Sequence, residues 1–316
     1  MPIDCCLGID TSNYTTSLGL VTREGEILAN IKRPLPVPSG ERGLRQSDAL
    51  FAHTKNIPSA MDELKPLLNG KRIAAVGVSA KPRNVEGSYM PCFLAGVAAA
   101  HTAAAAMDAK LYYFSHQCGH LMAAIHSSGR LDLLAGRFGA FHVSGGTTEL
   151  VTAEKGENGF SVTCVGGTKD LHAGQAIDRI GVAMGLSFPC GPAMEQLAMN
   201  NTKKIPRCRV ASDGCYVHLS GLENMALKLY RETADAPLAA AFVFDFLGNA
   251  IAKMAEAYLL AYGEQPLLFA GGVMCNRIIR KKLESQFDSA FAAPALSADN
   301  AVGTALWAAQ RYFYQS

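Results

Sequence analysis

The sequence predicts an α/β protein built from two similar halves. Each half opens with three short apolar stretches separated by polar turns, at residues 5–12, 15–21 and 25–31, and again at residues 137–146, 147–154 and 160–167. Stretches of this kind are typical of strands in an antiparallel meander. A Gly-Glu-Asn-Gly sequence at residues 156–159 supplies the turn between the last two. The repeated meander therefore predicts a duplication.

Helices and strands alternate after each meander. The first half continues with a helix at 47–68, a strand at 72–80, a helix at 92–109 and a strand at 111–115. The second continues with further helices, a strand at 266–272, a helix from Cys275, a strand at 291–295 and a helix from Ala298. The order βββαβαβα, taken twice, predicts duplicated actin-like domains (ASKHA, ribonuclease H-like) with a nucleotide cleft between them.

The predicted domains are residues 1–115 and residues 116–316. The C-terminal helix is expected to pack back on the first domain, and a polar insertion is expected in the second near residues 200–220. A chain of 316 residues, 49% of them hydrophobic, is long enough for two domains with substantial cores.

Composition favours a cytoplasmic protein without membrane segments. No uncharged apolar run reaches the ~20 residues that a membrane span needs, and the N-terminal residues do not have the pattern of a cleavable leader. The nine cysteines lack CxxC spacing, which favours reduced thiols. The net charge of +2 neither requires nor excludes a nucleic acid, because a local basic patch decides that question.

Three turns rich in glycine or short hydroxyl side chains are candidate nucleotide contacts. The first ends the opening strand, the second is the SGGTT sequence at the head of the second half, and the third ends the strand at 266–272. Backbone amides in such turns approach a phosphate closely. The alternative for each is a turn with no ligand. The candidate residues are Asp10, Thr11, Ser12, Ser144, Gly145, Gly146, Thr147 and Gly272.

The sequence HQCGH directly follows the strand at 111–115. His116 and His120 are four residues apart, which places both imidazoles on one face of a helix and suits a metal such as zinc or iron. The alternative is a pair of solvated or capping histidines. Asp299, near the start of the last helix, is the candidate third ligand, and a helix cap is the alternative for this residue.

A third motif combines an acid with a tight loop. Asp178 lies on an amphipathic helix that runs into a Phe-Pro-Cys-Gly-Pro sequence at 188–192. Asp178 is expected to hold ribose hydroxyls, and Gly191 to let the loop approach the ligand. The alternative is a solvated carboxylate beside Arg179.

Six sequence blocks carry a family resemblance. They are HQCGH (116–120), FHVSGGTTEL (141–150), GQAIDRIGVAMGLSFPCGP (174–192), HLSGLENMA (218–226), LLFAGGVMCN (267–276) and SADNAVGTA (297–305). In this order, and across nearly the whole chain, they resemble the glycoprotease-like family that makes threonylcarbamoyl-adenosine in tRNA. The resemblance implies an acyltransferase that passes a threonylcarbamoyl group from threonylcarbamoyl-AMP to the exocyclic amine of the adenosine beside the anticodon.

The resemblance also implies the ligands and partners. His116, His120 and Asp299 match the family's metal ligands, so one divalent metal, iron or zinc, is expected. The matches to positions that contact the adenylate are Ser144, Gly145, Gly146, Asp178, Gly191 and Asn276. The expected nucleotide is ATP or an acyl-AMP. The expected partners are tRNA, an adenylate-forming enzyme, and actin-like or ATPase accessory proteins.

The chain departs from the family pattern at three places. The family has an acidic pair after its first strand, where this chain has Tyr14 and Thr15. Residues 81–84 (KPRN) replace a GPGL-like loop, and Thr147 replaces a His or Asn. No general base is identified. These departures keep two alternatives open, a carbamoyltransferase acting through carbamoyl-AMP and a non-catalytic scaffold. HQCGH lacks the glutamate of an HExxH metalloprotease, which argues against proteolysis.

Overall fold

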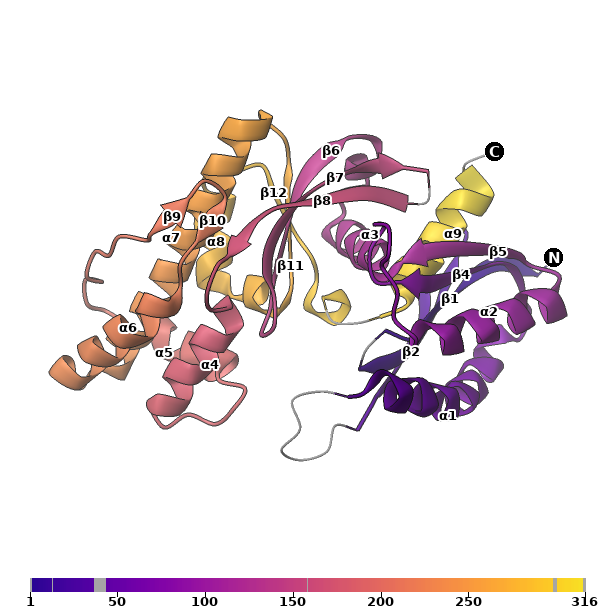
Figure 1. The fold of residues 1–316 in the computed structure, drawn as a ribbon, viewed down its shortest axis with the longest axis horizontal. Helices are drawn as coiled ribbons and strands as arrows, with labels where there is room; N and C mark the ends of the chain where they lie inside the picture. Colours follow the sequence, from indigo (N-terminus) through magenta and orange to yellow (C-terminus); the bar gives the residue numbers. More distant parts are fainter. Residues whose placement is uncertain (1, 13, 37–43, 158, 298–299, 315–316) are drawn as a thin grey trace. The chain divides into compact units, whose positions relative to one another are not determined.

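The computed structural model describes residues 2–12, 14–36, 44–157, 159–297 and 300–314, and the chain divides into two compact units (Figure 1). Unit 1 comprises Met1–Gly129, Lys155–Ser161 and Ala295–Ser316. Unit 2 comprises Arg130–Glu154 and Val162–Pro294. The domain boundary expected between residues 115 and 116 stays a prediction.

Unit 1 is built on a five-stranded sheet in the order β3-β2-β1-β4-β5. Its strands are β1 (Ile3–Asp10), β2 (Thr15–Thr22), β3 (Ile27–Pro34), β4 (Lys71–Lys81) and β5 (Lys110–Ser115). The first three form an antiparallel meander, and β4 and β5 run parallel to β1. Its helices are α1 (Gln46–Leu64), the 3-10 helix η1 (Lys65–Leu68), α2 (Phe93–Met107), α3 (His116–Ser128) and α9 (Val302–Tyr314).

The two faces of this sheet are covered differently. Because side chains alternate along a strand, Leu7 and Ile9 of β1 point to one face, where they share a buried core with α1 and α2. Gly8 lies between them and faces α9, so close that a Cβ there would lie 2.1 Å from the Ala301 carbonyl oxygen. Gly77 of β4 meets α9 in the same way, at 2.4 Å from the Thr304 carbonyl oxygen. Glycine at these positions lets α9 lie directly on the sheet.

Unit 2 repeats the same strand arrangement. Its sheet has the order β12-β11-β6-β7-β8-β10-β9. The strands are β6 (Arg137–Val143), β7 (Thr148–Gly156), β8 (Gly159–Thr168), β9 (Ser212–Asp213), β10 (Tyr216–Val217), β11 (Leu267–Ala270) and β12 (Ser289–Phe291). Without β9 and β10, the order β8-β7-β6-β11-β12 is that of unit 1. The predicted duplication is confirmed. The two extra edge strands lie within residues 200–220, where an insertion is expected, and that insertion stays a prediction.

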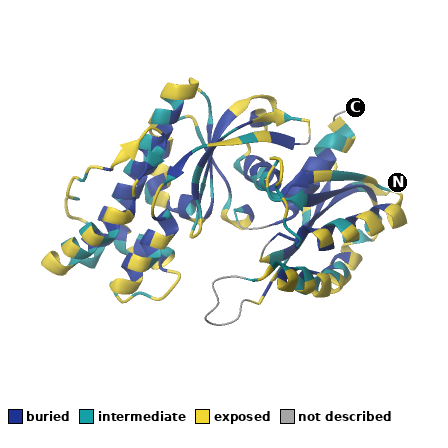
Figure 2. Cartoon of the chain, in the orientation of Figure 1, coloured by how far each residue is buried: buried dark blue, intermediate teal, exposed yellow. Residues whose placement is uncertain are grey.

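The helices of unit 2 surround one long central helix, α7. They are α4 (Ala173–Ala183), α5 (Gly191–Met199), α6 (Ser220–Thr233), α7 (Ala236–Tyr262) and α8 (Arg277–Glu284), with 3-10 turns η2 (Leu131–Ala135) and η3 (Gly272–Cys275). A further 3-10 turn, η4 (Pro294–Leu296), spans the point at which the chain passes from unit 2 to unit 1. Among the described residues, α7 alone is long and apolar enough to cross a membrane, yet 83% of its most apolar window is buried in the structure. It contacts α5, α6 and α8, and Figure 2 shows its buried side. Its apolarity is accounted for by the core of unit 2.

Several predicted element ends were wrong by a few residues. The helix expected to reach residue 68 ends at Leu64 and continues as a 3-10 turn. The helix expected from Cys275 begins at Arg277, because the Asn276 side chain accepts hydrogen bonds from the amides of Ile278 and Ile279 and so caps it. The last helix begins at Val302; the expected start, at Ala298, lies outside the described residues.

Candidate functional site

The two histidines of HQCGH lie on the first turn of α3, immediately after β5. Ser115 caps this helix by accepting a hydrogen bond from the Cys118 amide. His116 and His120 face one another with their Nε2 atoms 2.9 Å apart. The structure therefore places both predicted metal ligands on one helix face.

Asp10, at the end of β1, holds His116 in place. Its carboxylate oxygen lies 2.8 Å from His116 Nδ1, and its other oxygen accepts a hydrogen bond from the Ser12 amide at 2.8 Å. Asp10 is buried, which by itself would raise its pKa, but the interaction with His116, together with hydrogen bonds from Ser12 and Ser79, outweighs burial, and the pKa of the carboxyl lies below its ordinary value. An ionised carboxylate on Nδ1–H leaves the lone pair of a neutral imidazole at Nε2.

This arrangement suits a metal ion. Metal-binding histidines are usually oriented by a carboxylate on the ring nitrogen that does not bind the metal, which is the relation of Asp10 to His116. Asp299 lies outside the described residues, so its assignment as third ligand stays a prediction. Within the described part of the chain, no cluster of three or more His, Cys, Asp or Glu side chains is placed to bind a metal. The residue that caps α9 is Asn300, whose side-chain oxygen accepts hydrogen bonds from the amides of Val302 and Gly303.

Thr11 and Ser12, which follow Asp10 in the first turn, are both buried. The Thr11 hydroxyl donates to the Cys92 carbonyl at 3.0 Å and accepts from the Gly96 amide at 3.1 Å, so it fixes the start of α2. The Ser12 hydroxyl is buried and forms no hydrogen bond with any described residue. The expected role of these residues in phosphate contact stays a prediction.

The second glycine turn lies in unit 2, between β6 and β7. The Ser144 amide donates to the Thr147 carbonyl at 2.8 Å and closes the turn. The start of α4 lies against it: a Cβ on Gly174 would come within 2.6 Å of the Gly145 Cα and the Ser144 carbonyl oxygen. Apart from the chain neighbours, no atom of a described residue lies within 4 Å of the position that a Cβ would take on Gly145 or Gly146. One side of the turn is thus fixed on α4, and the other is open.

A cavity of about 270 Å³ brings five of the predicted contact residues together in unit 2. These are Gly145, Asp178, Gly191, Gly272 and Asn276. Most of the remaining wall is apolar, and is formed by Ile177, Pro189, Pro192, Phe244 and Val273. Ligand pockets commonly combine an apolar lining with a few convergent polar groups. Ser144, Gly146 and Thr147 belong to the same turn without lining this cavity.

Asp178 organises the loop at the mouth of this cavity. One carboxylate oxygen accepts a hydrogen bond from the Cys190 amide at 2.8 Å, which holds the segment between α4 and α5. Glu195 also lines the cavity and accepts a hydrogen bond from the Arg277 amide at 2.6 Å. Sequence reasoning missed Glu195, although it lies one helical turn after Gly191 and could have been found from that spacing.

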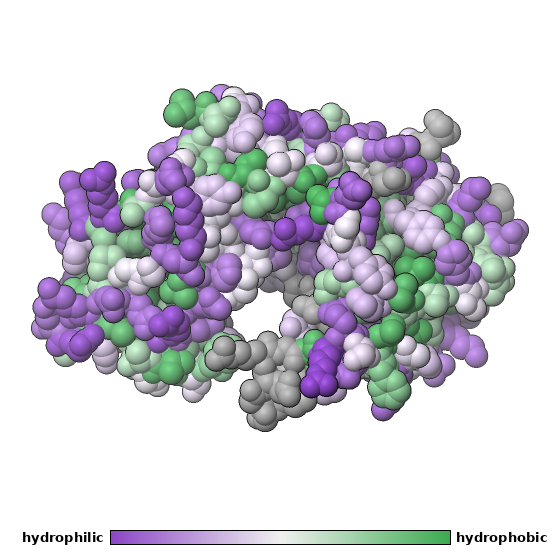
Figure 3. Space-filling model, viewed as in Figure 1, coloured by the Kyte–Doolittle hydropathy of each residue, from purple (hydrophilic) through white to green (hydrophobic). Residues whose placement is uncertain are grey.

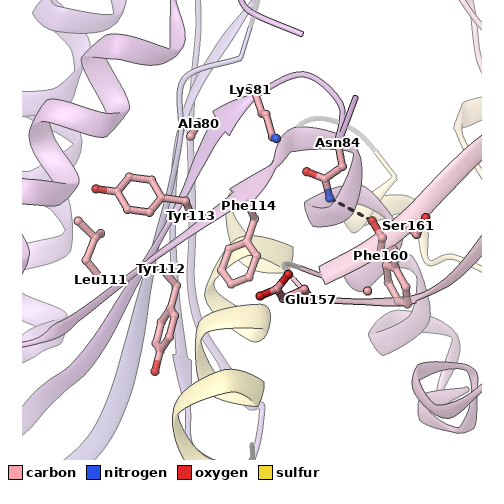
Figure 4. Close-up of a pocket in the computed structure, with 11 residues that line it drawn as sticks. Ala80, Lys81, Asn84, Leu111, Tyr112, Tyr113, Phe114, Glu157, Phe160 and Ser161 are labelled. Carbon is pink, nitrogen blue, oxygen red and sulfur yellow. Dashed lines mark hydrogen bonds between the residues drawn. The ribbon is translucent and has the colours of Figure 1, made fainter. Parts of the chain in front are cut away.

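Unit 1 contains a larger hollow, of about 540 Å³, beside the edge strand β5 (Figure 4). Tyr112, Phe114 and Phe160 supply aromatic surface, and Lys81 and Glu157 supply opposite charges. The Asn84 amide nitrogen donates to the Phe160 carbonyl at 3.0 Å and lies 3.2 Å from Cys118 Sγ. The segment that departs from the family's GPGL-like loop therefore forms one wall of this hollow and is joined to α3.

Relatives with a known activity match nearly the whole chain. The sequence model of the tRNA N6-adenosine threonylcarbamoyltransferase family matches residues 37–306. The protein of that name from Streptococcus equi subsp. zooepidemicus is 32% identical over 323 residues, covering 97% of this chain and 91% of the relative. The Bacillus cereus protein of the same name is 31% identical over 298 residues, covering 89% and 82%.

Solved structures with little sequence identity share the fold. Component A of (R)-2-hydroxyglutaryl-CoA dehydratase from Acidaminococcus fermentans superposes with a TM-score of 0.55 at 14% identity, covering 98% of each chain. A ROK family glucokinase from Streptomyces griseus, in complex with glucose and AMPPNP, gives 0.53 at 13% identity, covering 97% of this chain and 99% of the glucokinase. These similarities confirm the actin-like fold class. The family match confirms the resemblance read from the sequence, and the chain belongs to the tRNA N6-adenosine threonylcarbamoyltransferase family of acyltransferases.

Proposed function

We propose that this chain transfers a threonylcarbamoyl group from threonylcarbamoyl-AMP to the exocyclic amine of the tRNA adenosine beside the anticodon. Family membership supports the reaction class. The observation that carries the proposal is the cavity of unit 2, where residues from five separate segments surround a space with an apolar wall and a few polar groups. An adenylate is the substrate part that such a cavity suits.

The cavity offers a different contact to each part of an adenylate. Ile177, Phe244 and Val273 provide apolar surface for the purine. The Asp178 carboxylate is a hydrogen-bond acceptor for ribose hydroxyls. The open side of the turn at Gly145 lets backbone amides approach the phosphate, since no side chain stands in the way.

His116 and His120 would hold one divalent metal, iron or zinc, with Asp299 as the predicted third ligand. When bound, the metal supplies a Lewis acid that stabilises negative charge developing on a substrate oxygen. Asp10 acts on this site as a positioning residue, because its hydrogen bond fixes the ring of His116 and directs the Nε2 lone pair away from β1.

The proposed reaction also defines the partners. An adenylate-forming enzyme must supply threonylcarbamoyl-AMP, and tRNA must supply the amine. Actin-like or ATPase accessory proteins are further proposed partners, and the cytoplasm is the proposed compartment, because tRNA and ATP are present there.

A second candidate is carbamoyl transfer through carbamoyl-AMP. The observation that favours it is the pair Tyr14 and Thr15, which stand where the family has two acids. Tyr14 is partly exposed, and Thr15 opens β2. Neither side chain carries the negative charge that would attract the threonyl ammonium group.

Two reaction mixtures distinguish these candidates. In the first, the protein is incubated with threonine, bicarbonate, ATP, the adenylate-forming enzyme and tRNA, and the digested tRNA is analysed by mass spectrometry. Threonylcarbamoyl-adenosine supports the proposal. Its absence, together with AMP release in a second mixture that contains the protein, carbamoyl phosphate and ATP, would replace the proposal by the carbamoyl reaction. Nucleotide binding without transfer to any acceptor would favour the non-catalytic scaffold.

A further inference from the structure

Positive charge is concentrated on two segments of unit 2. Residues 199–211 and 276–286 together contain eight Lys or Arg residues and one Glu, whereas the whole chain has a net charge of only +2. The rest of the chain therefore carries a net negative charge. Such an asymmetry indicates a surface that attracts a polyanion.

The first segment follows α5 in an extended conformation that turns its charges outward. Cys208 and Val210 pack on the core of unit 2, and Cys208 Sγ lies 3.3 Å from Met225 Sδ. The Lys253 ammonium donates to the Val210 carbonyl at 3.0 Å. Arg207 and Arg209 alternate with these inward residues and are exposed. Figure 3 shows hydrophilic side chains over the left-hand part of the molecule, where Figure 1 draws this segment.

The second segment is α8, which presents a cationic face. Its Ile279 and Leu283 are buried, whereas Arg277 and Lys281 are exposed. Arg277 and Lys281 are four residues apart, so they lie on the same side of the helix. Their positions are set by the buried side chains and by the cap at Asn276.

Helix α8 connects two cavities of unit 2. Asn276, at its N-terminal end, lines the proposed adenylate cavity. Gln286, just beyond its C-terminal end, lines a separate cavity of about 570 Å³ whose wall includes Arg207 and Arg209. Eight helical residues span about 12 Å. The cationic residues thus extend from one cavity towards the other.

Acidic neighbours neutralise only part of this charge. Asp235 pairs with Lys203, Asp245 with Lys282 and Glu284 with Arg280. Glu256 lines the second cavity. In the part of the chain that the structure describes, the remaining five cations form no ion pair. These five define the basic strip: Lys204, Arg207, Arg209, Arg277 and Lys281.

The aromatic ring of Phe188 lies beside the adenylate cavity, at one end of the basic strip. Phe188 is 75% exposed and directly precedes Pro189, which lines the adenylate cavity. Exposed aromatic rings beside basic surfaces are used to stack unpaired bases. A membrane surface would require several exposed apolar side chains along the strip, but Met199 is the single large exposed one in the two described segments.

We propose that the basic strip binds the phosphodiester backbone of an RNA substrate and that Phe188 stacks on an unpaired base of that RNA beside the adenylate cavity. The identification of this RNA as tRNA rests on the proposed function. The surface itself rests on charge, exposure and its continuity with the cavity. It binds RNA whether or not the acyl group is threonylcarbamoyl.

The test measures binding rather than turnover. Fluorescence anisotropy with labelled tRNA, repeated over a range of salt concentrations, compares the full-length wild type with Arg207→Ala/Arg209→Ala and with Phe188→Ala. The double variant should bind about tenfold more weakly at 0.1 M salt, with a salt slope reduced by about 1.5 to 2, because two phosphate contacts are lost. Phe188→Ala should bind about fivefold more weakly with an unchanged slope, because stacking releases no counterions.

Controls separate this surface from the reaction. Lys65→Ala/Lys110→Ala removes two exposed cations of unit 1 and should leave tRNA affinity unchanged. AMP binding, measured by calorimetry, should be the same in all four proteins. If Arg207→Ala/Arg209→Ala bound tRNA as the wild type does, or if the wild type bound anionic vesicles but no tRNA, the strip would not be an RNA surface. If the strip bound tRNA but no modified nucleoside were formed, RNA binding by the strip would be supported and the proposed reaction would be contradicted.

Discussion

The turn after the first strand of unit 1 and the equivalent turn of unit 2 have the same place in two matching sheets, yet they are built oppositely. In unit 1, the side chains of Asp10 and Thr11 are buried and bonded to the protein. In unit 2, Gly145 and Gly146 leave their side of the turn open. One topological position is therefore built in two ways. In unit 1 the bonded side chains support neighbouring groups, and in unit 2 the glycines leave one side of the turn open.

The largest expected effect concerns the backbone beside the open turn. Gly271 has φ +98°, and a Cβ there would lie 2.3 Å from the Val143 carbonyl oxygen. Gly271→Ala should lower the free energy of unfolding by about 3 kcal/mol, through overpacking and backbone strain. Gly272→Ala is the matched control, since no atom of the described residues beyond its chain neighbours lies within 4 Å of its Cβ position. Equal urea midpoints for the two variants would show that the close approach to Val143 is not required.

The second prediction tests whether Asp10, in the turn after β1, orients His116 for metal binding. Asp10→Asn keeps the shape but removes the charge that orients His116, so zinc affinity should fall about 10- to 100-fold. Competition with a chromophoric chelator measures it, and Asp62→Asn, on the exposed side of α1, is the control. Unchanged affinity in Asp10→Asn would leave Asp10 with no positioning role.

The third effect follows from a buried histidine of unit 1. Burial lowers the pKa of His53 from 6.5 to about 4, and its Nδ1 lies 2.8 Å from the Thr16 hydroxyl. Above pH 6.5 the residue is neutral in both the folded and unfolded states. As the pH falls towards 4, the unfolded chain takes up a proton that the folded chain does not, so stability is lost at about 1.4 kcal/mol per pH unit.

The measurement compares urea unfolding at pH 7 and pH 5 in the wild type and His53→Gln. The wild type should lose about 2 kcal/mol more than the variant over this interval. Burial also lowers the pKa of His126, so some pH dependence should remain in the variant. Parallel pH profiles for the two proteins would contradict the assignment to His53.

The smallest effect separates two roles of Asp178 in unit 2. Its carboxylate accepts a hydrogen bond from the Cys190 amide, which an asparagine oxygen also accepts. Asp178→Asn should therefore keep the loop but weaken AMP binding about fivefold, since a charge-assisted bond to ribose becomes a neutral one. Asp178→Ala should weaken it further, by about 1–3 kcal/mol in all. Calorimetry that found Asp178→Asn equal to the wild type would limit Asp178 to holding the loop.

Local sequence patterns predicted the fold because meanders and helix periodicity are properties of neighbouring residues. Gly145 and Asp178, expected from their motifs, and Asn276, expected from the family resemblance, line one cavity of unit 2, and their roles as ligand contacts stay predictions. The contact between Asp10 and His116 could not be predicted, because 106 residues separate them and the pairing depends on how β1 and β5 are ordered in the sheet. The outward direction of Arg207 and Arg209 likewise depends on which neighbours reach the core.

The packing of α9 on Gly8 and Gly77 also affects the order in which the two units fold during synthesis. The strands of unit 1 are made before unit 2, but one face of their sheet is covered by a helix made after the whole of unit 2. Domains generally fold as units as they emerge. Unit 2 can therefore complete its core first. Until α9 is made, the face of the unit 1 sheet that α9 covers stays exposed. A ribosome-bound nascent chain is most vulnerable to chaperone capture and aggregation in this interval, and the emergence of α9 ends it.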